Sequence, residues 1–581
     1  MSVRGVRRLA LLMAAATIII VNHGGMDVAG QGEAGIRVDV MPTKAFFRPG
    51  EAAQFEVTAS TGARVEATIT HLTATVAEVS AALDGGRAVL AWEPPGIAPR
   101  GYGLTVRALD ADERILGTAS TAFDVLERWT QAPRYGFLSQ FQPGRTDAAE
   151  TAAWATRFHL NGLQFYDWQY RHERLLPPTE EYADVLGRSL SMGVVRALIE
   201  AAHARNIAAM PYTAIYGASV AFYREHPDWA LFQFGNVPYT FGDNFLIIMD
   251  PSRGSPWAMH LLDEYARVLD ETAFDGIHID QYGAPKIGRS ASGARVDLAQ
   301  VFPEFINDAA MVVRSRRGAA GATIFNAVGN WPVETVATAD QDTVYIEVWQ
   351  PYVYYLDLAR LVSDAQRLGG GKPVIIAAYI HPRAIHNVRL ANAMIFASGG
   401  YHLELGEPGA MLADPYFPQY GMMDATLQTV MRRYYDFLVR YAERLSLGTA
   451  PADSRAADLT IDGAETTGLR SRDRVAVLVR AGEGFETFSL VNLMGLAGGQ
   501  WNVLLDEGPT PLSDLSVRVR VDRPVARAWL ATPDGMAGAD DTAIGAQVVR
   551  FTTERDAAGM YIALQVPQLM YWTMLVLEYG S

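Results

Sequence analysis

Residues 274–283 read FDGIHIDQYG, and this stretch decides the fold. Its middle five residues, GIHID, are predicted to form a short buried strand. Successive side chains of a strand point to opposite faces, so Ile277 and Ile279 point together toward one layer. His278 and Asp280 then point toward the other. This pattern is typical of a strand in a parallel barrel, whose polar C-terminal tip faces the mouth of the barrel.

Asp280 has a second interpretation, because aspartate often caps the N-terminus of a helix. The residues that follow it are QYGAPKIGRS, which are rich in Gly, Pro and Ser, and the next helical pattern begins near Asp297. A cap requires its helix to begin at once. The sequence therefore favours a strand that ends in a cleft.

Short apolar strands alternate with helical patterns on both sides of this stretch, which predicts parallel βα units. The eight expected strands are 135–139, 162–166, 208–215, 276–280, 323–328, 343–349, 373–380 and 401–405. The clearest helical patterns are 147–158, 192–206, 255–272, 298–317, 357–368, 387–397 and 426–444. Eight units over about 310 residues suit a (β/α)8 TIM barrel with long loops. An open doubly wound sheet would need a Gly-rich phosphate turn after its first strand, and QFQPGRTD does not supply one.

The barrel, assigned to residues 130–446, is flanked by two predicted β-domains. Residues 35–127 alternate apolar and polar side chains between regular turn clusters, which indicates an immunoglobulin-like β-sandwich. Residues 447–581 alternate in the same way and predict a C-terminal antiparallel β-domain, a second β-sandwich. A chain of 581 residues is too long for one core, which agrees with several domains.

The composition of the chain excludes several classes of binding partner and of chemistry. The net charge of −15 argues against nucleic acid and anionic membranes, and it is compatible with a neutral polymer substrate. Cysteine is absent, which rules out disulfides and thiolate chemistry. We expect no cofactor, no metal site and a monomeric protein.

Residues 1–30 are predicted to be an export signal. Arginines at positions 4, 7 and 8 precede an apolar run at 9–21, and small residues at 28–30 supply a cleavage region. A membrane anchor is the alternative, but the run is shorter than the roughly 20 residues of a membrane span. The expected location is secreted or periplasmic, with no membrane association after the signal is removed.

The predicted sixth strand contains a second carboxylate in the segment TVYIEVWQP. Glu347 faces the same side as Tyr345 and Trp349, and opposite to Ile346 and Val348. A lone Glu in a buried strand is costly unless it has a partner or a function. It is either half of an ion pair inside the barrel or a general acid whose pKa is raised by the aromatic side chains around it.

Further polar and aromatic side chains follow the ends of other predicted strands. They are Gln164, Tyr166, Asp167, Trp168, Tyr170, Arg171 and His172, then Tyr212 and Tyr216, then Asn326, Asn330 and Trp331, and finally Tyr379, His381, His402 and Glu404. The long loop 217–251 adds seven more aromatic or His side chains, which form either a substrate wall or local core. Any one of these side chains alone is more often packing than contact. Together they are typical of a sugar-binding site.

Two carboxylates without a phosphate loop or a Ser-His pair point to glycoside hydrolysis. A retaining enzyme separates its carboxyl groups by about 5–5.5 Å, and an inverting enzyme by about 6.5–9.5 Å. The sequence does not measure this separation, so both mechanisms stay open at this point.

The strings FDGIHIDQYG, NGLQFYDWQYRHERLLPP, YGFLSQF and YIEVWQPY resemble glycoside hydrolase family 66, the family of the dextranases and the cycloisomaltooligosaccharide glucanotransferases. The resemblance implies a retaining enzyme that cleaves α-1,6-linked glucan. It places Asp280 at the nucleophile position and Glu347 at the acid/base position. It also places the YDW string, residues 166–168, near the nonreducing side of the cut.

From these observations the sequence predicts a secreted endo-dextranase. The cyclising branch carries an extra carbohydrate-binding insert in its barrel, and none is recognised here, which favours hydrolysis. The alternatives are cyclisation by intramolecular transglycosylation and a non-catalytic glucan-binding protein. The residues expected to bind substrate are Tyr166, Asp167, Trp168, His172, Tyr212, His278, Gln281, Asn326, Trp349, Tyr379 and Glu404.

Overall fold

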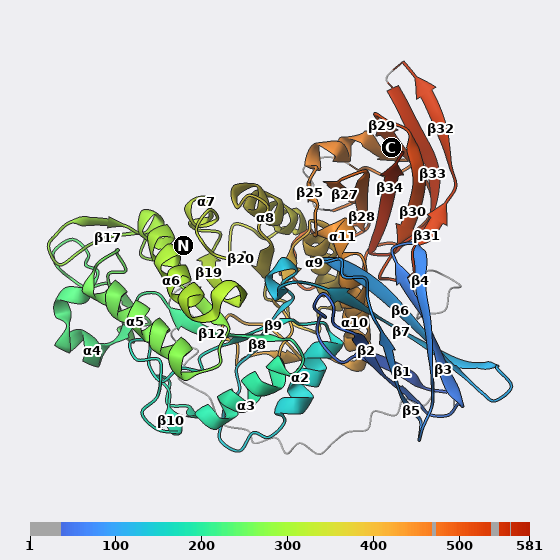
Figure 1. The fold of residues 1–581 in the computed structure, drawn as a ribbon. Helices are drawn as coiled ribbons and strands as arrows, with labels where there is room; N and C mark the ends of the chain where they lie inside the picture. Colours follow the sequence, from blue (N-terminus) through green and yellow to red (C-terminus); the bar gives the residue numbers. More distant parts are fainter. Residues whose placement is uncertain (1–35, 467–471, 536–544, 558, 581) are drawn as a thin grey trace.

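The structure, a computed structural model, describes residues 36–466, 472–535, 545–557 and 559–580. The export signal predicted at residues 1–30 lies outside the described residues. A central barrel adjoins an N-terminal and a C-terminal pair of β-sheets (Figure 1). Within the described residues, no helix combines the length and the apolar composition needed to cross a membrane.

The central sheet has eight parallel strands in the order in which they occur along the chain. They are β8 (Tyr135–Leu138), β9 (Gly162–Phe165), β12 (Ala208–Ala214), β16 (Gly276–Asp280), β19 (Ala322–Val328), β20 (Thr343–Glu347), β21 (Val374–Ala377) and β22 (Tyr401–His402). All eight predicted strands are present, and β16 has the predicted bounds. The (β/α)8 fold class is therefore confirmed, and the open doubly wound sheet is excluded.

The ring of strands closes between β8 and the residues that follow β22. The amide of Phe137 donates to the carbonyl of Leu405 at 3.1 Å. The Glu407 carboxylate accepts from the backbone N–H groups of Ser139 at 2.9 Å and Gln140 at 3.0 Å. Gly406 permits this approach, because a Cβ at that position would lie 1.8 Å from the Phe137 carbonyl oxygen.

Helices cover the outside of the barrel, where their apolar faces pack on the strands. They are α2 (Ala148–Arg157), α3 (Met192–His203), α5 (Pro256–Glu271), α6 (Leu298–Arg317), α7 (Val333–Val336), α8 (Tyr355–Leu368), α9 (Ile385–Ala397), α10 (Ala425–Arg440) and α11 (Ala442–Leu445). The residue that caps α6 is Asp297, whose side chain accepts from the Ala299 amide. The N-cap interpretation of Asp280 is therefore wrong.

The long loops after β9, β12 and β16 fold into small antiparallel ribbons of their own. They contain β10 (Glu181–Ala183) with β11 (Ser189–Ser191), then β13 (Gly217–Ser219) with β15 (Leu246–Ile248) and β14 (Thr240–Phe241), and then β17 (Ile287–Arg289) with β18 (Arg295–Asp297). The short helix α4 (Val220–Glu225) follows β13. These ribbons extend the barrel on one side. Figure 1 labels β17 at the left of the molecule and β10 at the lower left.

The N-terminal domain pairs a three-stranded with a four-stranded antiparallel sheet. Their orders are β1-β2-β5 and β4-β3-β6-β7, with β1 (Val38–Pro42), β2 (Ala53–Ala59), β3 (Arg64–His71), β4 (Ala74–Ala82), β5 (Arg87–Trp92), β6 (Arg100–Leu109) and β7 (Ile115–Val125). Alternate residues of β2 and β3 enter the core between the two sheets, as the sequence pattern predicts.

The C-terminal domain pairs a six-stranded with a four-stranded sheet around its own core. The first contains β25 (Ala450–Pro451), β27 (Val475–Gly482), β28 (Phe485–Asn492), β34 (Trp572–Tyr579), β30 (Val525–Ala531) and β31 (Gln547–Val549). The second contains β26 (Leu459–Ile461), β29 (Leu512–Val521), β33 (Gly559–Leu569) and β32 (Phe551–Asp556).

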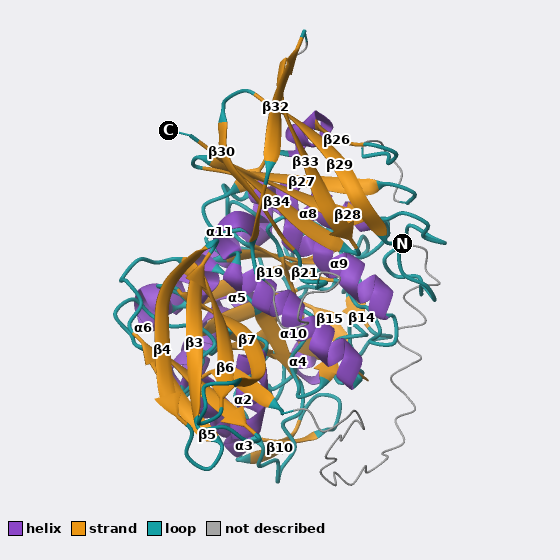
Figure 2. Cartoon of the chain, turned by 90° about the vertical axis from the view of Figure 1, so that its right-hand side faces the viewer, coloured by secondary structure: helices purple, strands orange, loops and turns teal. Residues whose placement is uncertain are grey.

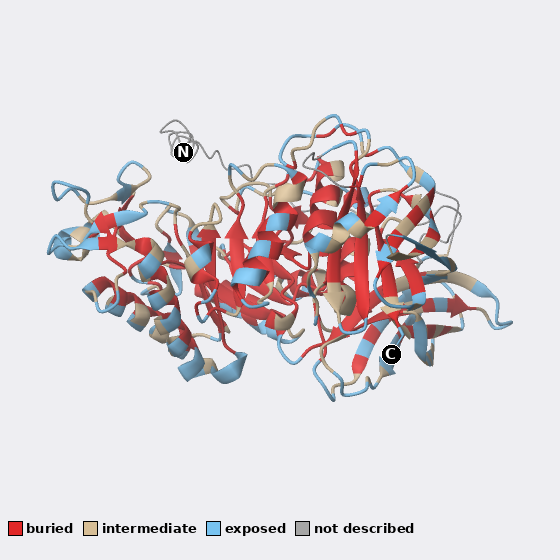
Figure 3. Ribbon diagram, turned by 90° about the horizontal axis from the view of Figure 1, so that it is seen from above, coloured by how far each residue is buried: buried red, intermediate tan, exposed pale blue. Residues whose placement is uncertain are grey.

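Both β-domains are packed tightly against the barrel helices. The helices α9, α10 and α11 lie between them (Figure 2), and α11 touches strands of both. Asp436 on α10 accepts from the Thr121 hydroxyl at 3.0 Å and from His159 Nε2 at 2.7 Å, which joins β7 to the barrel. Buried residues run without a break from the barrel into the C-terminal sheets (Figure 3). The two β-domains therefore pack against the helical layer of the barrel.

Candidate active site

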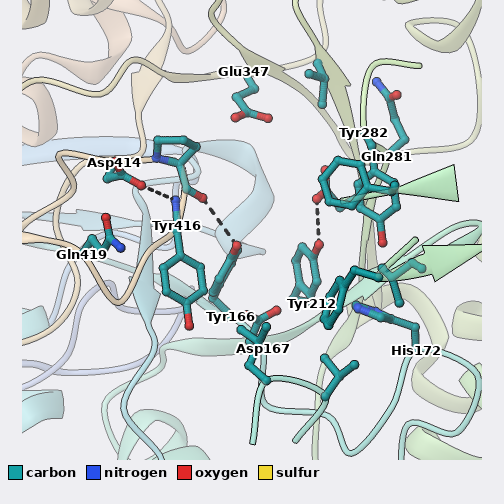
Figure 4. A pocket seen from close by; sticks show the side chains of 18 of the residues that line it. Tyr166, Asp167, His172, Tyr212, Gln281, Tyr282, Glu347, Asp414, Tyr416 and Gln419 are labelled. Atoms are coloured by element: carbon teal, nitrogen blue, oxygen red, sulfur yellow. Dashed lines mark hydrogen bonds between the residues drawn. The ribbon is translucent and has the colours of Figure 1, made fainter. Parts of the chain in front are cut away.

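A cavity of about 210 Å³ opens at the C-terminal ends of the barrel strands. Eight of the residues predicted from the sequence line it: Tyr166, Asp167, His172, Tyr212, Asp280, Gln281, Glu347 and Trp349. Figure 4 shows Glu347 and the phenol rings of Tyr166 and Tyr212 pointing into the same space. Convergence of residues from β9, β12, β16 and β20 follows from the parallel sheet, which brings every C-terminal strand end to one rim.

One amide group joins the two carboxylates. Asn326, on β19 between β16 and β20, donates from Nδ2 to Asp280 Oδ1 at 2.7 Å and to Glu347 Oε2 at 2.9 Å. Since both oxygens touch one nitrogen, they lie no more than about 5.6 Å apart, the combined length of the two bonds. This upper limit is compatible with the range of about 5–5.5 Å for a retaining pair, and it lies below the lower bound of about 6.5 Å for an inverting pair.

Each carboxylate also accepts a hydrogen bond from a tyrosine on its other oxygen. The Tyr212 hydroxyl donates to Asp280 Oδ2 at 2.8 Å, and the Tyr379 hydroxyl donates to Glu347 Oε1 at 2.9 Å. Within the described residues no Lys, Arg or His forms an ion pair with Glu347. The structure therefore does not support the ion-pair interpretation of Glu347.

Burial raises the pKa of both carboxyl groups. Loss of solvent is the largest cause for Asp280, and the charge of nearby Glu347 adds to it. Loss of solvent is also the main cause for Glu347, and the hydrogen bond from Asn326 opposes it. Because two close buried carboxylates resist carrying two negative charges, the pair retains one proton to a higher pH than ordinary carboxyls do. One ionised and one protonated carboxyl is the state that acid-assisted displacement requires.

We expect Asn326→Ala to lower kcat/KM by about tenfold to a hundredfold, because hydrogen bonds to charged groups contribute about 1.5–3 kcal/mol. The ionised carboxylate loses its shared donor, so its pKa rises and the acidic limb of the pH profile of kcat/KM moves to higher pH. The measurement is that pH profile. Asn330→Ala is the control, since Asn330 donates to the Tyr352 hydroxyl. An unmoved acidic limb in Asn326→Ala would contradict the assignment.

Asp167 occupies the cavity wall in a strained backbone conformation. Its φ is 54°, a region that residues other than glycine rarely adopt and that often marks functional positions. Burial raises its pKa to about 6, although the Arg188 guanidinium opposes the shift. Arg188 lies 3.5 Å from the Asp167 carboxylate and is held by Asp184 at 2.7 Å. Arg188, in the turn between β10 and β11, therefore holds the Asp167 carboxylate in place.

Three of the residues predicted to bind substrate, Trp168, His278 and Glu404, do not line this cavity. Trp168 is fully buried, where its Nε1 donates to the Tyr212 carbonyl at 3.2 Å and its ring packs on Phe274. Glu404 accepts from the Tyr435 hydroxyl on α10 at 3.2 Å, so it faces the helix layer. His278 lies inside the barrel with Nδ1 3.2 Å from the Tyr135 hydroxyl, and burial lowers its pKa to about 3.

Asn326 and Tyr379 are predicted to bind substrate, but in the structure they bind the two carboxylates. Both contact the carboxylates directly, and neither lines the cavity. Gln281 lines the cavity, and its Nε2 donates to the Asn326 carbonyl at 3.3 Å. These three residues therefore position the carboxylates.

Sequence reasoning missed one wall of the cavity. The segment after β22, with Asp414, Pro415, Tyr416 and Gln419, faces the carboxylates. The Tyr166 hydroxyl, 3.4 Å from the Pro415 carbonyl, links it to β9. The signal was available in the string DPYFPQY, a dense aromatic and acidic run in the loop after the eighth strand. Among the described residues there is no group of three or more His, Asp or Glu side chains placed to hold a metal ion.

Two curated proteins resemble this chain over most of its length. A cycloisomaltooligosaccharide glucanotransferase from Niallia circulans is 24% identical over an alignment that covers 98% of this chain and 75% of the relative. A dextranase from Streptococcus salivarius is 22% identical, with 82% of this chain and 67% of the relative covered.

A solved structure has the same fold. It is a cycloisomaltooligosaccharide glucanotransferase from Paenibacillus sp., complexed with cycloisomaltoheptaose, and it superposes with a TM-score of 0.84 at 23% identity over 92% of this chain and 99% of that one. The family described as glycosyl hydrolase family 66 matches residues 42–576, which include every strand of the barrel and both carboxylates. The chain therefore belongs to glycosyl hydrolase family 66.

Proposed function

We propose that this enzyme acts on α-1,6-linked glucan by double displacement, and that a sugar hydroxyl, often from the same chain, receives the glucosyl group. The observation that carries the proposal is the pair of carboxylates joined by Asn326, whose bridged oxygens lie no more than about 5.6 Å apart, close enough for a retaining pair. The preference for transfer rests on the glucanotransferase from Niallia circulans, whose alignment covers 98% of this chain, whereas the alignment with the dextranase covers 82%.

In the first step the Asp280 carboxylate attacks the anomeric carbon of a bound glucosyl unit. The bond from that carbon to the glycosidic oxygen breaks, and Glu347 gives its proton to the departing oxygen. In the second step Glu347 takes a proton from the acceptor hydroxyl, whose oxygen attacks the anomeric carbon and releases Asp280. Asn326, Tyr212 and Tyr379 hold the two carboxyls in place throughout.

Hydrolysis is the second candidate, with water as the acceptor and an endo-dextranase as the result. One observation favours it. The alignment with the Niallia circulans glucanotransferase spans 751 positions, at least 170 more than this chain has residues, so that relative carries segments that are absent here. Such a difference favours hydrolysis, because the cyclising branch is expected to carry an extra carbohydrate-binding insert in its barrel. Export, predicted from residues 1–30, is part of either proposal, since a polymeric substrate is accessible outside the cytoplasm.

The test is digestion of dextran, pullulan and starch, followed by mass spectrometry of the products. Transfer within one chain yields cyclic oligosaccharides, each lighter by one water than the linear product of the same length. Linear isomaltooligosaccharides alone would select hydrolysis. Cleavage of starch but not of dextran would overturn the α-1,6 assignment.

A further inference from the structure

The ribbons beside the cavity carry a group of exposed apolar side chains. Phe234, at the tip of the turn between Gln233 and Val237, is 90% exposed, Val237 is 54% exposed and Ile287 on β17 is 45% exposed. Single exposed apolar residues are ordinary on protein surfaces, but three on one projecting lobe call for an explanation. We name this group the Phe234 surface; the strand β17, which carries Ile287, is labelled at the left of Figure 1.

The Phe234 surface is built on a paired framework. The backbone N–H of Phe232 donates to the Arg289 carbonyl at 2.8 Å, and the N–H of Arg289 donates back at 2.9 Å. The Tyr239 hydroxyl donates to the Ile287 carbonyl at 3.0 Å. These bonds join the loop after β12 to the loop after β16, so the exposed side chains stand on one rigid unit.

The same unit forms a wall of the cavity. The ring of Phe241 stacks on that of Tyr282 with centroids 4.3 Å apart, and both rings line the cavity together with Phe245. Phe241 lies seven positions after Phe234, a stretch of chain that spans at most about 25 Å when fully extended. The loop after β12 therefore carries both the aromatic wall of the cavity and the exposed Phe234 at its tip.

The chemistry at the tip suits a sugar chain. The Phe234 ring offers an apolar face to the C–H groups of a pyranose, and the Arg289 guanidinium, 6.0 Å from the ring centre, offers donors to its hydroxyls. We propose that the Phe234 surface is a distal binding site for the α-1,6-glucan chain whose reacting unit occupies the cavity. The substrate class rests on the proposed function. We favour the glucan over another partner because the loop that carries Phe234 also lines the cavity.

The test compares Phe234→Ala with the parent enzyme on long dextran and on isomaltotriose. We expect kcat/KM on dextran to fall by about fivefold to tenfold, the loss of a modest contact. The value on isomaltotriose should stay unchanged, since the proposal assigns Phe234 to glucosyl units beyond the third. Phe234→Trp should retain the dextran value. Ile115→Ala removes an apolar side chain that is 58% exposed in the N-terminal domain, and it is the matched control.

Two results would overturn the distal site: an unchanged kcat/KM on dextran, or an equal fall on both substrates. Binding separates this proposal from the proposed function. In the Asp280→Asn background, Phe234→Ala should migrate faster than its parent through a native gel that contains dextran. If neither protein is retarded, the distal site is rejected whatever reaction the cavity performs. A loss of self-association in Phe234→Ala, seen by sedimentation, would assign the surface to a second copy of this chain.

Discussion

Asp280→Asn is expected to reduce turnover of α-1,6-glucan by at least about a thousandfold, because an amide does not form the covalent glucosyl intermediate. The fold should survive, since Asn has nearly the shape of Asp and can still accept from Tyr212 or Asn326. The measurements are kcat on dextran and the circular dichroism spectrum. Retention of full activity in a well-folded variant would remove Asp280 from the mechanism.

The same substitution is expected to raise the thermal stability of the protein at neutral and alkaline pH. Burial and the charge of Glu347 raise the folded-state pKa of Asp280 above its unfolded value. The folded state therefore binds the proton more tightly, and its stability is lost as pH rises from the unfolded pKa through the folded pKa. Asp280→Asn removes this loss, so its Tm should exceed that of the parent above neutrality.

The difference in Tm should shrink as pH falls and vanish below about pH 4, the ordinary pKa of a free aspartate. Asp263→Asn, at an exposed position on α5, is the control and should show no such trend. A difference in Tm that does not change with pH would show that the folded-state pKa of Asp280 is not raised.

Glu347→Ala is expected to lower kcat on dextran by about a hundredfold to ten-thousandfold, the range of a lost general acid and base. Substrates with an activated aryl leaving group need no proton in the first step, so their glucosylation should be nearly unaffected. Azide should then restore turnover, because it fits the space left by the side chain and attacks without a base.

The configuration of the azide product separates the two carboxylates. Glu347→Ala should yield the α-glucosyl azide, formed by attack on the covalent intermediate on Asp280. Asp280→Ala has no intermediate, so azide would attack the substrate directly and yield the β-glucosyl azide. Nuclear magnetic resonance of the products distinguishes the two. A β-azide from Glu347→Ala would reverse the assigned roles.

Local pattern was sufficient to predict the architecture. The alternation of GIHID and of TVYIEV located β16 and β20 and placed Asp280 and Glu347 at their C-terminal ends. A parallel barrel collects such ends at one rim, so the meeting of the two acids followed from the order of the strands. The distinctive strings around them were also sufficient to indicate the family.

Other residues show the limit of that reasoning. His402 and Glu404 obey the alternation of a strand, yet His402 Nδ1 lies 2.7 Å from Asn392 Oδ1 on α9, so this face meets the helices. Trp168 lies three residues after the end of β9, but it turns inward against Phe274. Alternation defines two faces, and only the packing of neighbouring elements decides which of them meets a helix and which meets the cavity.

The sequence by itself determined the eight strands, the two carboxylates and the kind of chemistry they suggest, because these depend on the periodicity of contiguous residues. Only the tertiary structure decided that Asn326 bridges the carboxylates, that Arg188 holds Asp167 from a separate ribbon, and that the loop at 414–419 closes the cavity. Each of these contacts joins segments tens to hundreds of residues apart. No local pattern encodes them, since they arise only when the barrel closes and brings its loops together.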